Sequence, residues 1–431
     1  MIRILSLSVL FALSLNMQAQ KSAREEIADN PFLSGSNYLD YDRYPATKAL
    51  TPAPKGYEPF YISHYGRHGS RWLIGKNDYT RVADVLHKAA ANGKLTEKGC
   101  ETLDQLERFI PCTIKRFGDL TTVGERQHHG IGRRMTEHFP EIFKHKNVPI
   151  DARSTVVPRC ILSMIAECEE FAAANPTARI HNDVSESLQY YLNQPHDDRL
   201  KEAGKRVSRK ERRVYQERIT HPERLMQVLF NDQQWVKDSV NSYDVMYNLF
   251  EVASNMQSHD TDIDLLSLFT ADELYSQWCL RNYRWYLDYG PAPQTGGLMP
   301  LSQRNLLTNI IETADTIIKD NAAKANVQAT LRFGHEVCVM PLACLLELDS
   351  CNVSVSNPDE LDRHWRNYNI FPMACNIQIV FYRQKKGNGD VLVKVLLNER
   401  EATLPAKPVT GPYYKWSDLR KYYTEKLKSY Q

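Results

Sequence analysis

A five-residue segment, Arg67-His68-Gly69-Ser70-Arg71, places two arginines around a histidine directly after a β-rich run at 57–64. A guanidinium group is permanently charged, and its planar set of N–H donors matches the oxygens of a phosphate. A glycine lets the backbone turn close to a ligand. The segment therefore predicts that both arginines orient a phosphoryl group beside the histidine and neutralise its charge as it transfers. The alternative interpretation is a solvated loop.

A second arginine motif, Arg153-Ser154-Thr155, follows an extended run at 148–153 and precedes a predicted helix at 157–174. Arg153 is expected to complete an anion site at the end of a second strand, helped by the amides of the helix N-terminus. The serine and threonine could equally be ordinary helix caps. Arg159, further along the helix, is interpreted as structural.

A third motif, Gly334-His335-Glu336, comes after the β run ATLRF and opens a predicted helix that continues over 337–348. A carboxyl group in this place can protonate a departing alkoxide, and the histidine can donate to a phosphate oxygen. The motif is not that of a zinc protease, because no second histidine follows Glu336 at the required spacing. Taken alone, the pair could be structural.

The elements that must position these motifs alternate along the chain. Strands are expected at 57–64, 148–153, 328–334, 376–382 and 391–397, with a hairpin turn at 386–390. Helical periodicity is found at 78–92, 96–117, 123–139, 157–174 and 416–428. This alternation indicates an α/β layer, and strand ends in such layers are where ligands bind.

Between 183 and 304 the pattern is helical almost throughout, with predicted helices at 222–230, 235–258 and 271–289. The sequence therefore predicts a discontinuous α/β catalytic domain, 20–182 and 305–431, with an inserted all-helical cap domain at 183–304.

The first nineteen residues have the pattern of a signal peptide: Arg3, an apolar run at 4–15 and a small residue, Ala19, for cleavage. The alternative, an anchor helix, is disfavoured because the run is shorter than the ~20 residues that a membrane span needs. No other long apolar run occurs. We expect an exported protein, periplasmic or secreted, with no membrane span in the mature chain.

Lys and Arg total 54 against 52 Asp and Glu, so no global positive field argues for nucleic acid. The nine cysteines form no CxxC pair and no Cys/His metal spacing, and they are expected to be mostly buried, inert thiols.

A strongly basic stretch at 199–213 contains eight basic and two acidic residues, a local charge of +6. If the helical insert caps the site, this stretch would suit a highly phosphorylated substrate. The alternative is a solvated helix face. The candidate substrate-binding residues in it are Lys205, Arg206, Arg209, Lys210, Arg212 and Arg213.

The three motifs, in this order, resemble the histidine acid phosphatase family, a branch of the histidine phosphatase superfamily. The resemblance covers roughly 57–400 and extends to the segment 120–124 with Gly130 and Arg133. It implies a three-layer α/β fold of the phosphoglycerate-mutase type, with a mixed, mostly parallel sheet and a helical cap. It further implies no metal and no cofactor. The implied roles are a phosphohistidine at His68, phosphoryl binding by Arg67, Arg71, Arg153 and His335, and proton donation by Glu336.

Within this family, the leader and the length fit phytases and multiple inositol-polyphosphate phosphatases. Those enzymes commonly carry His-Ala-Glu, a register that places Val337 at the acid position, whereas Glu336 occupies the place of Asp in His-Asp acid phosphatases. The resemblance implies an exported phosphomonoesterase that hydrolyses inositol polyphosphates. Two alternatives remain: a broad-specificity phosphatase for sugar phosphates, and a non-catalytic polyanion-binding protein. The oligomeric state is open.

Overall fold

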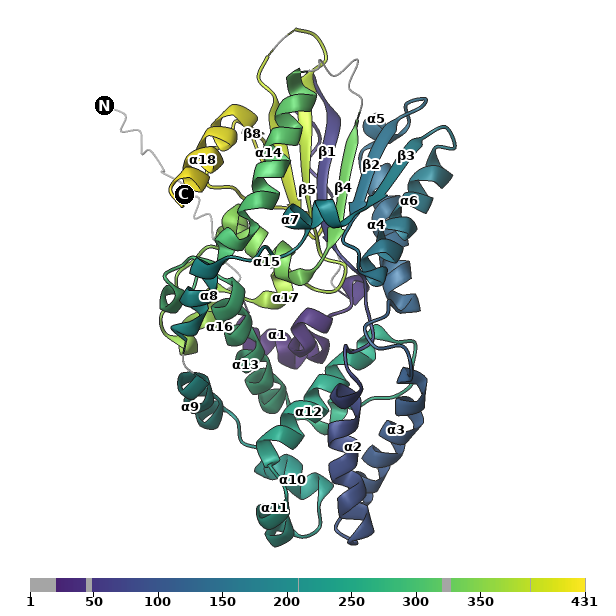
Figure 1. Cartoon of the computed structure of the whole chain (residues 1–431), viewed down its shortest axis with the longest axis vertical. Coiled ribbons are helices and arrows are strands. Elements are labelled where there is room, and N and C mark those ends of the chain that lie inside the picture. Colours follow the sequence, from purple (N-terminus) through teal and green to yellow (C-terminus); the bar gives the residue numbers. More distant parts are fainter. Residues whose placement is uncertain (1–20, 44–48, 208, 320–326, 388, 431) are drawn as a thin grey trace, which may run out of the picture.

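The structure is a computed structural model that describes residues 21–43, 49–207, 209–319, 327–387 and 389–430. The predicted signal peptide, 1–19, lies outside the described residues. One mixed sheet forms the upper half of the molecule in Figure 1. Its strands are β1 (Tyr57–Arg67), β2 (Pro149–Ser154), β3 (Arg179–Val184), β4 (Ala329–Gly334), β5 (Asn376–Gln384), β6 (Leu392–Leu397), β7 (Arg400–Glu401) and β8 (Tyr414–Lys415).

The strand order is β3-β2-β4-β1-β5-β6-β7, and β8 also pairs with β6. Strands β3, β2, β4 and β1 run parallel, whereas β5 pairs antiparallel with both β1 and β6. In this register Arg67 lies opposite Gly334, and Ser154 lies opposite Phe333. The carboxyl ends of β1, β2 and β4 therefore meet at one edge of the sheet, and all three sequence motifs begin there.

Helices cover both faces of the sheet, which gives the three layers that the family resemblance implies (Figure 1). One face packs against α4 and α6 through a core that includes Ile62, Ile150 and Leu331. The other face packs against α14, α15 and α18. The helices of this part are α4 (Thr122–His138), α5 (Pro140–Phe143), α6 (Pro158–Ala174), α7 (Gln189–Leu192), α14 (Arg304–Lys319), α15 (Glu336–Leu345) and α18 (Trp416–Lys428).

A helical lobe occupies the lower half of Figure 1. Its separate hydrophobic core combines Ile27, Leu86 and Leu106 with Phe250 and Trp278. The remaining helices are α1 (Ala23–Asp29), α2 (Lys76–Ala91), α3 (Glu97–Thr113), α8 (Asp198–Lys205), α9 (Arg209–Ile219), α10 (Glu223–Leu229), α11 (Gln233–Ser239), α12 (Ser242–Asn255), α13 (Ala271–Tyr289), α16 (Leu361–His364) and α17 (Asn367–Ile370).

The core of this lobe thus includes α1, α2 and α3, which precede the predicted insert in the chain. The division into 20–182, 183–304 and 305–431 follows chain order, whereas the core of this lobe joins segments from all three ranges, including Tyr368 and Met373 from the last. Strand β3 also extends to Val184, past the expected start of the insert at 183.

Threonine caps fix the starts of several long helices. Thr96, Thr121 and Thr270 accept hydrogen bonds from the third helical amide of α3, α4 and α13, respectively, which satisfies a donor that the helix itself leaves unpaired. The cap of α4 matters most for the site, because Thr121 also donates through its Oγ1 atom to the carbonyl of Ser70, at 3.0 Å.

Six of the nine cysteines are buried, as expected, and all nine are free thiols. No helix in the described part of the chain is both long and apolar enough to cross a membrane.

Candidate active site

His68 follows the last residue of β1 and is fully buried. Its backbone N–H donates to the carbonyl of Gly334 at 3.0 Å, and its carbonyl accepts from Ala374 at 3.1 Å. The ring Nδ1 lies 2.8 Å from the carbonyl oxygen of Gly69, which can only accept, so Nδ1 carries the proton. The lone pair of Nε2 is therefore directed into the site, and this atom has no hydrogen-bond partner.

Burial, reinforced by the positive charges of Arg159 and Arg67, lowers the pKa of His68 well below its usual value. The imidazole is consequently neutral at the pH of most assays. A neutral ring with a free Nε2 lone pair is the form required of a nitrogen nucleophile.

Two glycines in contact explain the compact loop after His68. A Cβ atom on Gly69 would lie 2.3 Å from the carbonyl oxygen of Gly124, and a Cβ on Gly124 would lie 2.3 Å from that of Ser70. The first turn of α4 can therefore approach the loop only because both side chains are absent. The loop is also held by Gln127, whose Oε1 accepts from the Ser70 amide at 2.9 Å.

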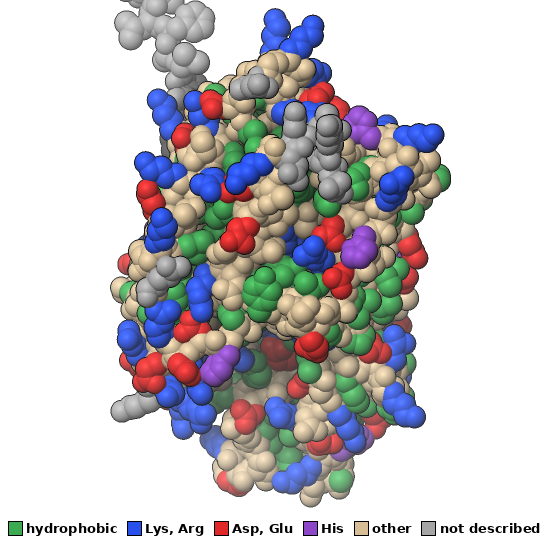
Figure 2. Space-filling model, turned by 45° about the horizontal axis from the view of Figure 1, so that its top comes forward, with side chains coloured by type: hydrophobic (Ala, Val, Ile, Leu, Met, Phe, Trp, Pro, Cys, Tyr) green, Lys and Arg blue, Asp and Glu red, His purple; other side chains and the backbone are tan. Residues whose placement is uncertain are grey.

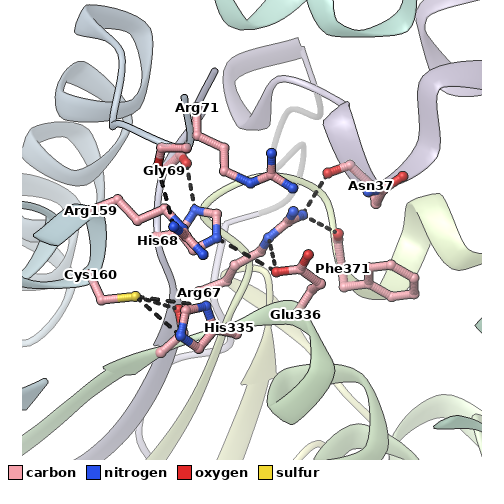
Figure 3. A network of polar contacts seen from close by, with 12 residues as sticks. Asn37, Arg67, His68, Gly69, Arg71, Arg159, Cys160, His335, Glu336 and Phe371 are labelled. Carbon is pink, nitrogen blue, oxygen red and sulfur yellow. Dashed lines mark hydrogen bonds and ion pairs between the residues drawn. The ribbon is translucent and has the colours of Figure 1, made fainter. Parts of the chain in front are cut away.

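Arg67 is fully buried, and its position is set by main-chain oxygens. Its Nη1 donates to the carbonyls of Asn37, at 2.6 Å, and Phe371, at 3.1 Å. Its Nε lies 3.1 Å from a carboxylate oxygen of Glu336, while Nη2 has no partner. Figure 3 shows this guanidinium between Asn37, Phe371 and Glu336.

Arg71 and Arg159 complete the positive charge around the histidine. Figure 3 shows both side chains, with Arg67, around the His68 ring. Arg71 donates from Nη1 to the Trp72 carbonyl at 2.9 Å, and Arg159 donates to the Gly118 carbonyl at 3.3 Å. The Nε atoms of both arginines are buried without a partner.

The structure does not support the expectation that Arg153 supplies the third guanidinium. Arg153 donates from Nη1 to the Tyr191 hydroxyl at 3.0 Å, and its Nη2 lies 2.6 Å from Asp151. Along β2 its side chain alternates with the buried Ala152 and Ser154, so it shares a face with Asp151. Arg159, which the sequence pattern suggested was structural, lies beside His68, where Arg153 was expected. It reaches this position because it belongs to the first turn of α6, which begins at the carboxyl ends of the same strands.

His335 directly precedes the first residue of α15 and lies beside His68, with ring centroids 5.6 Å apart in an edge-to-face arrangement. Its Nε2 is 3.4 Å from the Thr155 hydroxyl, and the Sγ of Cys160 lies 3.8 and 3.9 Å from its two ring nitrogens. Burial lowers the pKa of His335 to about 4, so this ring is neutral as well. Burial raises the pKa of the Cys160 thiol to about 12, which makes that thiol unreactive.

Glu336 is the first residue of α15, and its carboxylate oxygen lies 3.6 Å from His68 Nε2. Burial favours its neutral form, but the charge of Arg67, contact with His68 and the charge of Arg71 together hold the pKa well below its usual value. Of the two acid positions that the sequence left open, Glu336 is the one that contacts His68. Val337 contributes instead to the hydrophobic packing around the sheet.

The net charge of the groups around His68 suits an anionic ligand. With both histidines neutral, Arg67, Arg71 and Arg159 contribute +3 and Glu336 contributes −1, for a net +2. A phosphate monoester carries about −1.5 to −2 at neutral pH. These arginines have buried N–H groups without a partner in the protein, and phosphate oxygens would satisfy them.

The same residues also include a set that could in principle bind a metal. One ligand atom each from His68, His335 and Glu336 lies within 4.8 Å of the others. Three guanidinium groups surround this set, however, and their repulsion disfavours a cation there. The donor set therefore fits phosphate better than a metal ion.

A cavity of about 360 Å³ opens from Arg71 and Glu336 toward the helical lobe. It is lined by Asn37, Tyr38, Arg71, Arg212, Tyr215, Gln216, Tyr247, Glu251, Leu280, Arg281, Tyr283, Arg284, Trp285, Asp288, Tyr289 and Glu336. Its wall is thus rich in aromatic rings and carries charges of both signs. Figure 2 shows the same intermixing of acidic and basic side chains on one face of the molecule.

Of the predicted basic stretch, the structure brings Arg212 to this cavity. Lys205 and Arg213 form ion pairs within their own helices, with Glu202 at 2.9 Å and Glu217 at 2.7 Å. Arg206 and Arg209 are exposed, and the side chain of Lys210 is not among those described. Neighbouring residues of a helix point in different directions, so the six basic candidates at 205–213 do not form one binding surface.

Sequence reasoning missed the cavity residues contributed by α12 and α13, among them Glu251, Arg284 and Asp288. A charged residue on a helix gives no sign of the direction in which it faces. The main-chain oxygens that hold Arg67 also have no sequence signature.

Comparisons with known proteins agree with this geometry. The family model described as the histidine phosphatase superfamily, branch 2, matches residues 67–398, well over half of the chain. No curated protein matched the chain.

Solved structures share the fold. The apo multiple inositol polyphosphate phosphatase of Bifidobacterium longum superposes with a TM-score of 0.70 and 18% identity, covering 90% of this chain and 96% of that one. Its complex with inositol hexasulfate gives 0.67 and 18%, covering 91% and 97%. The phytase from D. castellii gives 0.67 and 16%, covering 96% and 88%. The chain therefore belongs to branch 2 of the histidine phosphatase superfamily and is a phosphoric monoester hydrolase.

Proposed function

We propose that this protein hydrolyses inositol polyphosphates through a phosphohistidine on His68. The observation that carries the proposal is the free Nε2 lone pair of a buried, neutral imidazole beside unpartnered guanidinium N–H groups. That arrangement provides a nucleophile and an oxyanion site together.

In the first step, a substrate phosphoryl group is held by Arg67, Arg71 and Arg159, with His335 donating to one oxygen. Nε2 of His68 forms a bond to phosphorus while the P–O bond to the alcohol breaks. The leaving oxygen takes a proton from Glu336. The products of this step are a free alcohol, a phosphohistidine and the Glu336 carboxylate.

Glu336 must be protonated for this step, although the charge of Arg67 holds the pKa of this carboxyl group well below its usual value. A bound phosphate resolves the conflict. Its negative charge offsets the arginines and repels the carboxylate, so it raises the pKa of Glu336 toward the range of a general acid. Acidic conditions assist further, because they supply the proton.

In the second step, water attacks phosphorus and the P–N bond breaks. The Glu336 carboxylate accepts a proton from the water, inorganic phosphate leaves, and His68 returns to its neutral form. The guanidinium groups stabilise the charge on the transferring phosphoryl group in both steps, so the chemistry needs no metal.

The cavity supports a substrate larger than a single phosphate. Its volume falls within the ~300–1,000 Å³ typical of small-molecule sites. Four arginines line it, namely Arg71, Arg212, Arg281 and Arg284. The Bifidobacterium longum relative was crystallised with inositol hexasulfate, a sulfated analogue of the substrate proposed here.

A second candidate, a broad-specificity phosphatase for sugar phosphates, is favoured by one observation. Arg212 and Arg284 lie against Asp288, and Arg281 is paired with Glu251. These pairs reduce the positive charge that a highly phosphorylated substrate would meet.

Export is also proposed, and it rests on the signal-peptide pattern of residues 1–19. Expression of the full chain in a bacterial host, followed by fractionation and N-terminal sequencing, tests it. A mature protein that begins near residue 20 in an exported fraction would support it, and an intact N-terminus in the cytoplasm would contradict it.

Phosphate release from inositol hexakisphosphate and from glucose 6-phosphate, measured on the same preparation, distinguishes the two substrate classes. We expect kcat/KM to be at least about tenfold higher on the inositol substrate, a difference of ~1.4 kcal/mol in transition-state binding. Equal values would favour the broad-specificity phosphatase.

A further inference from the structure

The ionisable residues of the active-site cavity are ordered by depth. Arg71 and Glu336 are buried at its inner end. At its outer end the side chains of Asp288 and Arg212 are 30% and 33% exposed, and that of Arg284 is 64% exposed. The outer group therefore lies where the more distant phosphates of a large substrate would be placed.

Asp288 contacts both outer arginines. Its Oδ1 accepts from Arg212 Nη2 at 2.5 Å, and its Oδ2 lies 3.4 Å from Arg212 Nη1. The same Oδ2 is 3.6 Å from Nε of Arg284, one helical turn earlier on α13. A single carboxylate thus bridges a guanidinium from α9 and another from α13.

The carboxylate of Asp288 lowers the net positive charge of the cavity. The lining arginines Arg71, Arg212, Arg281 and Arg284 contribute +4, and Glu251, Asp288 and Glu336 contribute −3, which leaves +1. Removing the charge of Asp288 alone would double the net value to +2. A distal phosphate must either break the ion pair between Asp288 and Arg212 or bind close to the Asp288 carboxylate, which repels it. Both outcomes disfavour binding.

We propose that Asp288 is a selectivity residue. By neutralising Arg212 and Arg284 at the mouth of the cavity, it weakens the binding of substrates with several phosphates more than the binding of singly phosphorylated ones. This inference rests on the function proposed above for the same cavity. It predicts that the enzyme suits partly dephosphorylated inositol phosphates better than a cavity lined by unpaired arginines would. Asp288 touches no reacting atom, so its effect is on substrate choice and not on chemistry.

The test is competitive inhibition by inositol hexasulfate of p-nitrophenyl phosphate hydrolysis. Asp288→Asn keeps the shape of the side chain and removes its charge, and we expect the inhibition constant to fall about five- to tenfold. The gain should shrink in high salt, because the group is partly exposed. Asp288→Ala should change the constant in the same direction.

Asp359→Asn is the matched control. Asp359 accepts from both Nη atoms of Arg218, at 2.7 and 2.8 Å, and lines a different cavity. This variant also loses a partly exposed carboxylate that pairs with an arginine, and its inhibition constant should stay at the wild-type value.

An unchanged constant in both Asp288 variants would overturn the proposal. A raised constant would overturn it too, because it would show that Asp288 orients Arg212 for binding. The measurement requires only that the polyanion enter the cavity. Failure of the wild-type enzyme to hydrolyse inositol hexakisphosphate would remove the proposed substrate and leave this result interpretable.

Discussion

The Nε2 atom of His68 lies 3.6 Å from a carboxylate oxygen of Glu336, so the proposed nucleophile is in contact with the proposed proton donor. The two groups come from different strand ends, β1 and β4, which pair in parallel. A phosphoryl group has to enter between them and Arg67. In the proposed mechanism, the charge of the entering phosphate offsets that of Arg67 and raises the pKa of Glu336, which couples substrate binding to the protonation that the first step requires.

Replacing Glu336 should affect substrates according to their leaving group. We expect Glu336→Gln to lower the rate of phosphoenzyme formation from inositol phosphates at least about 100-fold, because an alkoxide needs a proton to depart. With p-nitrophenyl phosphate, whose leaving group is stable as an anion, the first step should slow far less. Rapid-quench kinetics on both substrates measures this, and equal losses would show that Glu336 is not the acid.

Arg159 and Arg153 should differ sharply in their effect on activity. Arg159→Ala removes a guanidinium beside His68 and should lower kcat/KM about 100- to 1,000-fold. Arg153→Ala breaks contacts with Asp151 and Tyr191 and should change kcat/KM less than about threefold. Steady-state kinetics of the two variants makes the comparison, with each serving as the control for the other. Equal losses would restore Arg153 as a phosphate ligand.

Gly124 should tolerate no side chain. In Gly124→Ala the new Cβ would meet the Ser70 carbonyl, so we expect a loss of ~1–3 kcal/mol in the free energy of unfolding and lower activity, because the loop after His68 must shift. Gly204→Ala is the control, since nothing lies within 4 Å of its added Cβ in α8. That change should be neutral or stabilising by up to ~1 kcal/mol. Denaturant unfolding tests both, and wild-type stability in Gly124→Ala would contradict the packing described.

Stability should fall as pH drops from about 6.5 toward 4. Burial lowers the pKa of His64, His259 and His335 to about 4, whereas in the unfolded chain these groups titrate near the usual ~6.5. Between these values the unfolded state binds more protons, so the free energy of unfolding decreases with falling pH, by up to ~1.4 kcal/mol per histidine and pH unit.

Urea unfolding at pH 7, 6 and 5 measures this dependence. His64 is an informative site, because neither of its ring nitrogens has a hydrogen-bond partner. In His64→Leu the slope with pH should be smaller than in the wild type. A wild-type stability that stays constant from pH 7 to 5 would contradict the proposed neutral, buried histidines.

Much of the fold could be predicted from local patterns. The runs at 57–64, 328–334 and 376–382 are rich in apolar and β-branched residues, and each corresponds to a buried strand. The sequence pattern does not predict strand β3, because its sequence, RIHNDV, is polar. It is the outermost strand of the sheet, and most of its side chains are exposed. The predicted helix at 235–258 divides into α11 and α12, with a break at Val240 and Asn241, where Asn241 caps the second helix.

The candidate site could be predicted only in part. Residue 67 ends β1, residues 68 and 71 lie within four positions after it, and residues 335 and 336 come directly after β4, so sequence order places all five at the carboxyl ends of these strands. Whether Arg153 or Arg159 reaches that site depends on the direction of each side chain, which the motif does not specify. Asp288 and Arg284 enter the cavity through packing of distant helices, and no local pattern encodes such packing.

The most direct test of the account is to trap and map the phosphoenzyme. Acid-free quenching of the enzyme during hydrolysis of labelled inositol hexakisphosphate or p-nitrophenyl phosphate, followed by peptide mapping, should place the label on His68. His68→Ala should give no label and no turnover while it still binds phosphate analogues. Label on another residue, or substantial activity in His68→Ala, would contradict the central claim that this imidazole attacks phosphorus.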